Sequence, residues 1–327
     1  MFLASIILLA GAIDAVPRII IDTDLRSDVD DAGTLAMVNA LADNGECELI
    51  GVIASQTGPY IVGAINAINT WYGREDVPIG LSPVDDERFT DHYAPVIGNP
   101  ENFPSTQSNE TAPDSTTLYR RLLNDSPDNS VKIVVIGGQT PVRLLLNSEA
   151  DHEGDGSINK SGLELIEAKV SGLYLMAGNF DNPDHAEHNI MLDLEASQYV
   201  AAEWPTSIVY SGFEIGRPVI TGGATTNPEE NPVAKAFELF PAGGRGTIAG
   251  SASFDQTMAY YAIRGNMADE VKLWDISEPG TVSFPNGPTV FEANPDGNHR
   301  YLIFSAPYEV VAEVIEALMI QPPKSRE

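Results

Sequence analysis

Short apolar runs alternate with amphipathic segments along the chain from Pro17 onward. The apolar runs predict strands at residues 18–21, 48–54, 131–136, 173–177, 207–210 and 301–304. Several are apolar throughout, as parallel strands covered on both faces are. The segments around them predict helices at residues 30–42, 61–72, 141–146, 162–168, 195–202, 255–264 and 308–319. This alternation predicts an α/β fold with an open, mainly parallel β-sheet flanked by helices, and it places ligands at the carboxyl ends of the strands.

Two polar stretches, residues 82–117 and 221–231, interrupt the alternation. Both are rich in turn-forming residues, so we predict long loops there. A loop as long as the first is usually functional or mobile, and whether it closes over a substrate stays open. No internal repeat or low-complexity tract divides the chain. We therefore predict a single domain over residues 17–322, followed by a short tail at 323–327.

The N-terminal segment, residues 1–16, is apolar and too short to span a bilayer comfortably. It resembles the apolar region of a secretory signal, with the small Ala15 as a cleavage point, although it lacks the usual basic start. We predict export to the periplasm or the medium. If the segment is instead a terminal strand or a mis-assigned start, the protein is cytoplasmic. No other apolar stretch reaches membrane-spanning length.

The chain is strongly acidic: its formal net charge is −29, and only 18 of its 327 residues are Lys or Arg. Binding to a nucleic acid polymer needs clusters of basic residues, so such a partner is excluded. The acidity itself is typical of a well-solvated surface. The single cysteine, Cys47, rules out an internal disulfide and a multi-cysteine metal site, and we expect it to be a small buried residue.

Aspartates crowd the stretch that follows the isoleucines of residues 19–21. Asp22 and Asp24 come at the carboxyl end of a predicted strand, where a period of two sends them to the same side. Asp30 and Asp31 open the next predicted helix, where carboxylates gain from the free N–H groups and the helix dipole. Because crowded carboxylates repel and raise one another's pKa values, we expect a cation among them. Oxygen ligands suit a hard cation, Ca²⁺ or Mg²⁺, rather than zinc.

Two other aspartate motifs fit this stretch poorly. An EF-hand loop would need a ligand where Arg26 stands, and a glycine in the turn that follows. A haloacid-dehalogenase phosphatase would need Gly-Thr after Asp-x-Asp, where this chain has Leu25-Arg26. Helix-capping aspartates with solvated charge are the purely structural alternative.

The same stretch resembles the N-terminal signature of the inosine/uridine-preferring nucleoside hydrolases: an apolar strand, Asp-x-Asp, a short loop and Asp-Asp-Ala. Residues 22–32 match its longer-loop bacterial form, although Leu25-Arg26-Ser27 stand where the family usually has glycine. Later stretches match other family segments in the expected order: Ile136-Gly137-Gly138-Gln139-Thr140-Pro141, Gly178-Asn179, Ala186-Glu187-His188-Asn189-Ile190, Asp193-Leu194-Glu195-Ala196 and Ser253-Phe254-Asp255. The resemblance implies a Rossmann-like nucleoside hydrolase fold and Ca²⁺-dependent hydrolysis of the N-glycosidic bond of ribonucleosides, giving free base and ribose.

The resemblance also implies a role for each matching residue. It assigns the Ca²⁺ ligands to Asp24, Asp31, the Thr140 carbonyl and Asp255, with Asp22 and Asp30 close to the metal or the ribose. Asp24 would also act as general base on a water held at the metal. The ribose hydroxyls would be bound by Asn179, Glu187 and Asn189.

The chain departs from the family at the leaving group. The histidine that many members carry before the last aspartate is Phe254 here, and phenylalanine cannot donate a proton. Its ring is expected to stack on the base. His188, which stands where the family commonly has Phe, and His92 are the other candidates for the base pocket. Base preference and the leaving-group acid stay open.

Three functions therefore compete. The leading one is a Ca²⁺-dependent nucleoside hydrolase of purine or pyrimidine nucleoside catabolism, acting on a small molecule and, by analogy with the family, able to form a homo-oligomer. The second is a hydrolase of another pentosyl or N-riboside compound, with a remodelled base pocket. The third is a non-catalytic, calcium-dependent sugar- or nucleoside-binding protein. The retained aspartates argue against the third, because a pure binder needs no general base beside the metal.

Overall fold

The computed structural model describes most of the chain. The described residues are 16–26, 28–84, 90–240, 246–247 and 250–324. The predicted signal segment therefore lies outside the described residues except for its last position, and so do the last three residues of the predicted tail. No helix among the described residues is long and apolar enough to cross a membrane.

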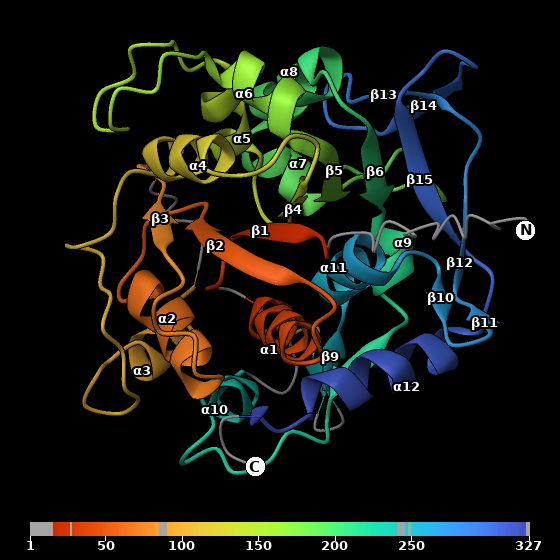
Figure 1. Ribbon diagram of the computed structural model, residues 1–327. Coiled ribbons are helices and arrows are strands. Elements are labelled where there is room, and N and C mark those ends of the chain that lie inside the picture. The colour runs from red at the N-terminus through yellow and green to blue at the C-terminus, as the bar shows by residue number, and fades with distance from the viewer. Residues whose placement is uncertain (1–15, 27, 85–89, 241–245, 248–249, 325–327) are drawn as a thin grey trace, which may run out of the picture.

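Strands and helices alternate through the described chain (Figure 1). The strands are β1 (Arg18–Thr23), β2 (Glu48–Ala54), β3 (Ile79–Leu81), β4 (Val131–Val135), β5 (Val170–Met176), β6 (Ile208–Ser211), β7 (Ile220–Gly222), β8 (Gly246–Thr247), β9 (Gly250–Ala252), β10 (Met267–Ala268), β11 (Val271–Lys272), β12 (Trp274–Ile276), β13 (Gly280–Ser283), β14 (Val290–Ala293) and β15 (His299–Phe304). The helices are α1 (Asp30–Asp43), α2 (Ile61–Trp71), α3 (Ala94–Ile97), α4 (Ser115–Asn124), α5 (Thr140–Leu146), α6 (Gly162–Lys169), α7 (His188–Leu192), α8 (Leu194–Glu203), α9 (Phe213–Gly216), α10 (Pro232–Leu239), α11 (Phe254–Arg264) and α12 (Tyr308–Met319).

The main β-sheet is largely parallel. Its strand order is β14-β13-β15-β6-β5-β4-β1-β2-β3. All neighbours from β15 to β3 along this order pair in parallel. At the other edge β13 and β14 form an antiparallel hairpin, and β13 also pairs antiparallel with β15. The open, mainly parallel α/β sheet expected from the sequence is therefore confirmed, and so is each predicted strand and helix, with ends that differ by a few residues.

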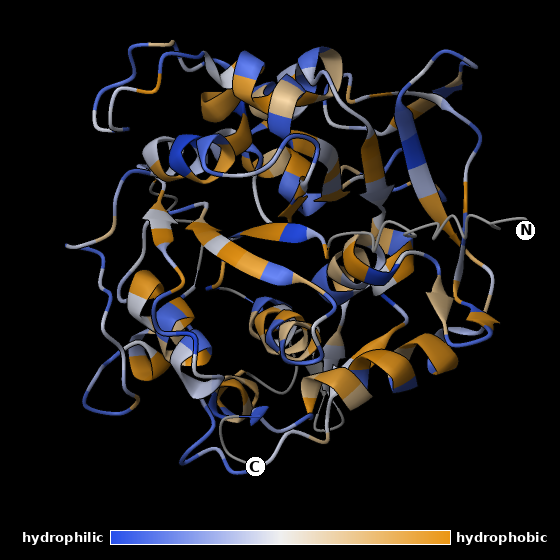
Figure 2. Ribbon diagram, viewed as in Figure 1, coloured by the Kyte–Doolittle hydropathy of each residue, from blue (hydrophilic) through white to orange (hydrophobic). Residues whose placement is uncertain are grey.

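Helices cover both faces of this sheet (Figure 1). On one face, Ile19 and Ile21 of β1 pack in one apolar cluster with side chains of α1, α2, α10, α11 and α12. On the other face, Ile20 packs in a second cluster with side chains of α4, α5, α6 and α8. In Figure 2, hydrophobic colour runs along much of β1 and β2, which lie between the two layers of helices. Burial on both faces explains why β1 carries consecutive isoleucines.

The polar stretch 82–117 is not one continuous loop, so that expectation is wrong. It contains the short helix α3, and α4 begins within it at Ser115. The Asp114 side chain caps α4 by accepting a hydrogen bond from the backbone N–H of Thr117 at 3.1 Å. The short strands β3, β13 and β14 are likewise absent from the predicted elements. Strands of three or four residues carry too little periodicity to stand out from loops.

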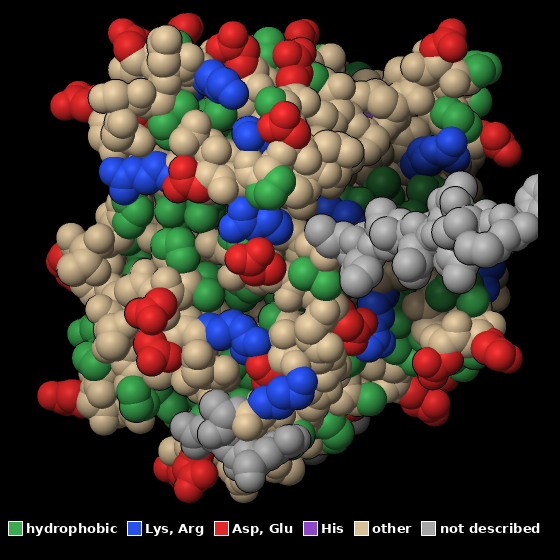
Figure 3. Space-filling model, in the orientation of Figure 1, with side chains coloured by type: hydrophobic (Ala, Val, Ile, Leu, Met, Phe, Trp, Pro, Cys, Tyr) green, Lys and Arg blue, Asp and Glu red, His purple; other side chains and the backbone are tan. Residues whose placement is uncertain are grey.

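Charged side chains are dispersed on the face that Figure 3 shows. Asp and Glu side chains project around the outline of the molecule, and Lys and Arg side chains occur singly or in small groups among them. A site for a polyanion would show a continuous basic patch instead. The exclusion of a nucleic acid polymer stays a prediction from the charge of the sequence.

Candidate metal centre and active site

A hollow at the carboxyl ends of the parallel strands collects most of the predicted site residues. Asp24 follows β1 directly, while α1 and α11 begin beside it with Asp30 and Phe254. The residues that line the hollow are Asp24, Asp28, Asp30, Ile136, Met176, Glu187, His188, Asn189, Phe213, Phe254 and Asp255. Ligands of open α/β folds bind at this end of the sheet.

The aspartates of α1 are fixed by hydrogen bonds from two other elements. Asp30 Oδ2 accepts hydrogen bonds from the backbone N–H groups of Phe254 at 3.1 Å and Asp255 at 3.4 Å, so it caps α11 and joins it to α1. The Thr23 hydroxyl donates to Asp31 Oδ1. Asp31 Oδ2 is buried and has no hydrogen-bond partner among the described residues. That free oxygen is available to a ligand in the cluster.

Burial raises the pKa of each aspartate in this region well above its usual value. The affected groups are Asp22, Asp24, Asp30, Asp31 and Asp255. For all of these except Asp22, the charges of neighbouring aspartates raise the pKa further. A buried group of like charges is costly unless a cation offsets it. The free carboxylate oxygen and the all-oxygen donor set therefore fit a bound divalent cation.

Three carboxylates lie close enough together to hold one ion. Ligand oxygens of Asp28, Asp30 and Asp31 lie within 4.8 Å of one another. Asp30 and Asp31 were predicted there from the sequence, whereas Asp28 was given no ligand role because it lies in the longer loop. The structure brings its carboxylate to the same point. This aspartate cluster could bind a metal ion.

Asp24 lies against the turn that follows β4. A Cβ atom at Gly137 would come within 2.9 Å of both the Asp24 Cβ and the Ser55 Oγ, so only glycine fits there. The Gln56 Nε2 donates to Asp24 Oδ2 at 3.4 Å. Gly137, the first glycine of the Gly-Gly segment singled out in the sequence, is thus needed for the close approach of the β4 turn to Asp24.

Glu187 and Asn189 tie the ends of β4 and β5 to α7. The Glu187 carboxylate caps α7 by accepting hydrogen bonds from the backbone N–H of Asn189 at 3.0 Å and of Ile190 at 3.2 Å. The Asn189 Nδ2 donates to the carbonyls of Ile136 at 3.2 Å and Met176 at 3.0 Å. Both side chains are buried, held by these hydrogen bonds, and line the hollow.

Asn179, Thr140 and Asp22 are not among the described residues that line the hollow. The Asn179 backbone N–H donates to Thr289 Oγ1 at 2.9 Å, and its side-chain oxygen accepts from the N–H of Asn182 at 2.8 Å. The Thr140 hydroxyl donates to Asp193 at 2.7 Å. Asp22 Oδ2 accepts from the Tyr119 hydroxyl at 2.7 Å. The predicted metal and ribose contacts of these three residues stay predictions.

Aromatic side chains form part of the wall of the hollow. Phe213 and Phe254 stack with ring centroids 5.2 Å apart and an interplanar angle of 26°. His188 is exposed at the same hollow. His92 is not among its described lining residues and packs edge-on against Phe240, with centroids 5.7 Å apart. Phe213 was not predicted; the available signal was its place just after β6, at the same end of the sheet.

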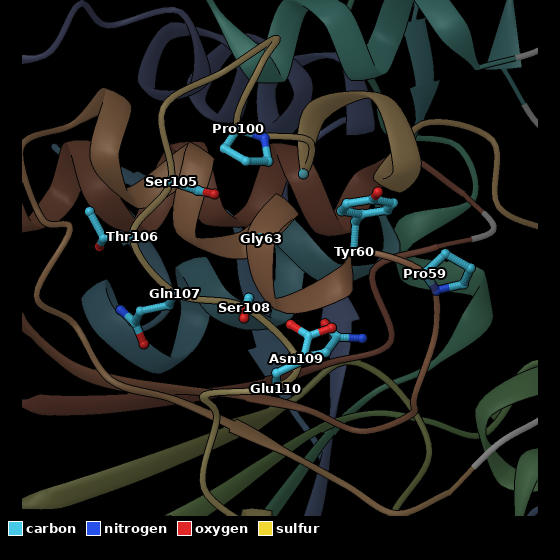
Figure 4. A pocket seen from close by; sticks show the side chains of 11 residues that line it. Pro59, Tyr60, Gly63, Pro100, Ser105, Thr106, Gln107, Ser108, Asn109 and Glu110 are labelled. Atoms are coloured by element: carbon cyan, nitrogen blue, oxygen red, sulfur yellow. The ribbon is translucent and has the colours of Figure 1, made fainter.

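A larger cavity of about 540 Å³ lies between the start of α2 and residues 98–110 (Figure 4). Its lining holds one carboxylate, Glu110, and two of its amide side chains are already used in the fold. Asn109 bridges the Gly58 carbonyl and the Val62 N–H, while Gln107 accepts from the N–H of Ile79. The clustered carboxylates lie instead in the hollow at the ends of the strands, and we therefore take that hollow as the candidate reaction centre.

Three comparisons with known proteins address the family. Solved structures resemble the fold: a plant nucleoside hydrolase (PpNRh1; 18% identity, TM-score 0.66, covering 94% of this chain and 100% of that one), a purine-preferring ribonucleoside hydrolase from Gardnerella vaginalis (14%, 0.63, 92% and 99%) and an inosine-uridine preferring nucleoside hydrolase from Bacillus anthracis (14%, 0.62, 93% and 99%). No curated protein matches the sequence. The sequence model of the family described as inosine-uridine preferring nucleoside hydrolase matches residues 19–291. The chain therefore belongs to the inosine-uridine preferring nucleoside hydrolase family and is an enzyme of the N-ribohydrolase type.

Proposed function

We propose that this protein hydrolyses the N-glycosidic bond of ribonucleosides to free base and ribose, in a reaction that depends on Ca²⁺. The observation that carries the proposal is the hollow that Asp24, Asp30 and Asp255 line together with Glu187 and Asn189. The aspartates can hold a cation and act on water, while Glu187 and Asn189 offer acceptors for sugar hydroxyls. The nucleoside hydrolase family of the chain supports this assignment.

Asp24 is the general base in this proposal. A cation bound among the aspartates would offset their charge and lower the pKa of a coordinated water. Asp24 then accepts the proton of the attacking water, with its carboxylate oriented by the Gln56 amide at 3.4 Å. As the bond to the base breaks, positive charge develops on the sugar, and the surrounding carboxylates stabilise it.

Glu187 and Asn189 position the sugar. The Glu187 carboxylate lies at the hollow and is anchored by the start of α7. The Asn189 Nδ2 is used by two backbone carbonyls, so its Oδ1 is left as an acceptor for a ribose hydroxyl. Both groups are fixed before substrate arrives, which lowers the entropy cost of orienting the ribose.

The base binds against the aromatic wall, and this gives a first prediction. Phe213→Leu should raise KM for nucleosides by about 2–10-fold, because an aromatic stack is worth roughly 0.5–1.5 kcal/mol. Steady-state kinetics at saturating Ca²⁺ measure it. The matched control is Phe291→Leu, since Phe291 packs against Tyr301 outside the hollow. An equal change in both variants would remove Phe213 from the base site.

The presence of Phe254 favours one alternative function, the hydrolysis of another N-riboside. With no histidine at this position, the base pocket differs from that of many family members, which suits another N-riboside whose leaving group needs no proton donor. Such a substrate would use the same aspartates and the same ribose contacts. The two functions therefore differ only in the group that leaves.

A substrate panel tests the proposal and its alternative. The purified chain, with Ca²⁺, is given inosine, guanosine, adenosine, uridine, cytidine and nicotinamide riboside, and free ribose is measured by a reducing-sugar assay. Release from the first five that stops on chelation is the expected result. Release from nicotinamide riboside alone would support the alternative. Nucleoside binding without any release would identify a binding protein and contradict both.

A further inference from the structure

Residues 91–93 hold the two ends of the connection between β1 and α1. Arg26 is 5% exposed and pairs with the Asp91 carboxylate through two hydrogen bonds, at 2.8 and 3.2 Å. It also donates to the Thr57 carbonyl at 2.6 Å. Leu25 and Val29 are fully buried on either side. Arg26 is therefore a fixed part of the fold rather than a solvated surface side chain.

A second contact fixes the backbone at Asp28. The Tyr93 hydroxyl, from a fully buried side chain, donates to the Asp28 carbonyl at 2.7 Å. This contact orients the residue so that its carboxylate enters the hollow and comes within 4.8 Å of the Asp30 and Asp31 ligand oxygens. The clamp formed by Arg26, Asp91 and Tyr93 thus holds a further negative charge against an already acidic cluster.

Such an arrangement costs free energy unless a ligand offsets it. Asp28 adds a third carboxylate within 4.8 Å of the ligand oxygens of Asp30 and Asp31, and both of those side chains are buried. The buried Asp31 Oδ2, which has no partner among the described residues, is an independent sign that a donor or cation belongs there. A cation that contacts Asp28, Asp30 and Asp31 would account both for the crowded carboxylates and for the unpartnered Asp31 oxygen.

We propose that Asp28 is a direct ligand of the bound cation, so that the longer loop of this chain adds one carboxylate to the metal shell. The inference rests on the proposed function only in placing a cation in the hollow. It assigns a role to the clamp, which presents Asp28 to the metal. An additional carboxylate strengthens binding of a hard cation.

The test measures Ca²⁺ binding alone, without nucleoside, by titration calorimetry on the full chain. Asp28→Asn should weaken Kd at least about tenfold, within the range found when groups around a metal are removed. Asp151→Asn, which removes the same charge from an exposed loop position, should leave Kd unchanged. Tyr93→Phe should weaken binding by a smaller factor, because it removes the clamp hydroxyl and keeps every charge.

A salt dependence distinguishes direct ligation of the cation by Asp28 from long-range attraction by its charge. Salt screens long-range attraction between exposed charges but has little effect on a direct bond to the ion. The loss in Asp28→Asn should therefore persist in 0.5 M KCl. A wild-type Kd in Asp28→Asn, or a loss that disappears in salt, would overturn the proposal. Neither result would contradict the proposed hydrolase function, because the substrate panel measures ribose release separately.

Discussion

Asp24→Asn should lower kcat for ribose release by about 10²–10⁴-fold, the usual contribution of a positioned general base. The carboxylate lines the hollow and is oriented by the Gln56 amide, so asparagine keeps the shape and loses the proton acceptor. Initial rates with the best nucleoside of the panel, at saturating Ca²⁺, measure the effect.

The same variant should remain folded. Burial and neighbouring aspartates raise the pKa of Asp24, so its ionised form destabilises the metal-free protein at neutral pH. Asparagine removes that cost, and metal-free Asp24→Asn should melt no lower than the wild type. Asp151→Asn serves as the activity control, since its exposed carboxylate lies outside the hollow. A kcat within tenfold of wild type would exclude Asp24 as the base.

The sheet and much of the site follow from local pattern. Consecutive apolar residues at 19–21 predict a strand buried on both faces, and β1 is one. Because parallel strands end at the same edge, Asp24 and the turn after β4 could be placed at the same edge of the sheet, although not beside one another. Asp30 and Asp31 could be placed at a helix start in the same way.

Long-range placement could not be derived in this way. The position of Asp28 in the cluster depends on Tyr93 and on the Arg26–Asp91 pair. Tyr93 and Asp91 lie more than sixty residues further along the chain, in a stretch that the sequence predicted to be a loop. Phe213 enters the hollow only because β6 and α11 bring it onto Phe254. Such contacts are set by tertiary packing, which neither periodicity nor residue type encodes locally.

Chelation of Ca²⁺ should lower the melting temperature at pH 7.5 by about 4 °C. Ligand at a hundredfold excess over Kd stabilises by about 2.7 kcal/mol, and each kcal/mol shifts the melting temperature of a domain of roughly 300 residues by about 1.6 °C. Differential scanning fluorimetry with and without chelator measures the difference, and Asp255→Asn should lose most of it.

The rise in melting temperature caused by Ca²⁺ should become smaller as pH falls. In the metal-free fold the pKa values of Asp24, Asp30 and Asp31 lie well above the unfolded value of about 3.9. The protonated aspartates therefore contribute their full stabilisation of the metal-free fold at pH values below the unfolded pKa. This contribution is lost as pH rises through the higher pKa values of the folded state. Protons also compete with the cation for the same oxygens. The Ca²⁺-induced rise in Tm should thus be smaller at pH 5 than at pH 7.5, and an equal rise at both would place the ion away from these aspartates.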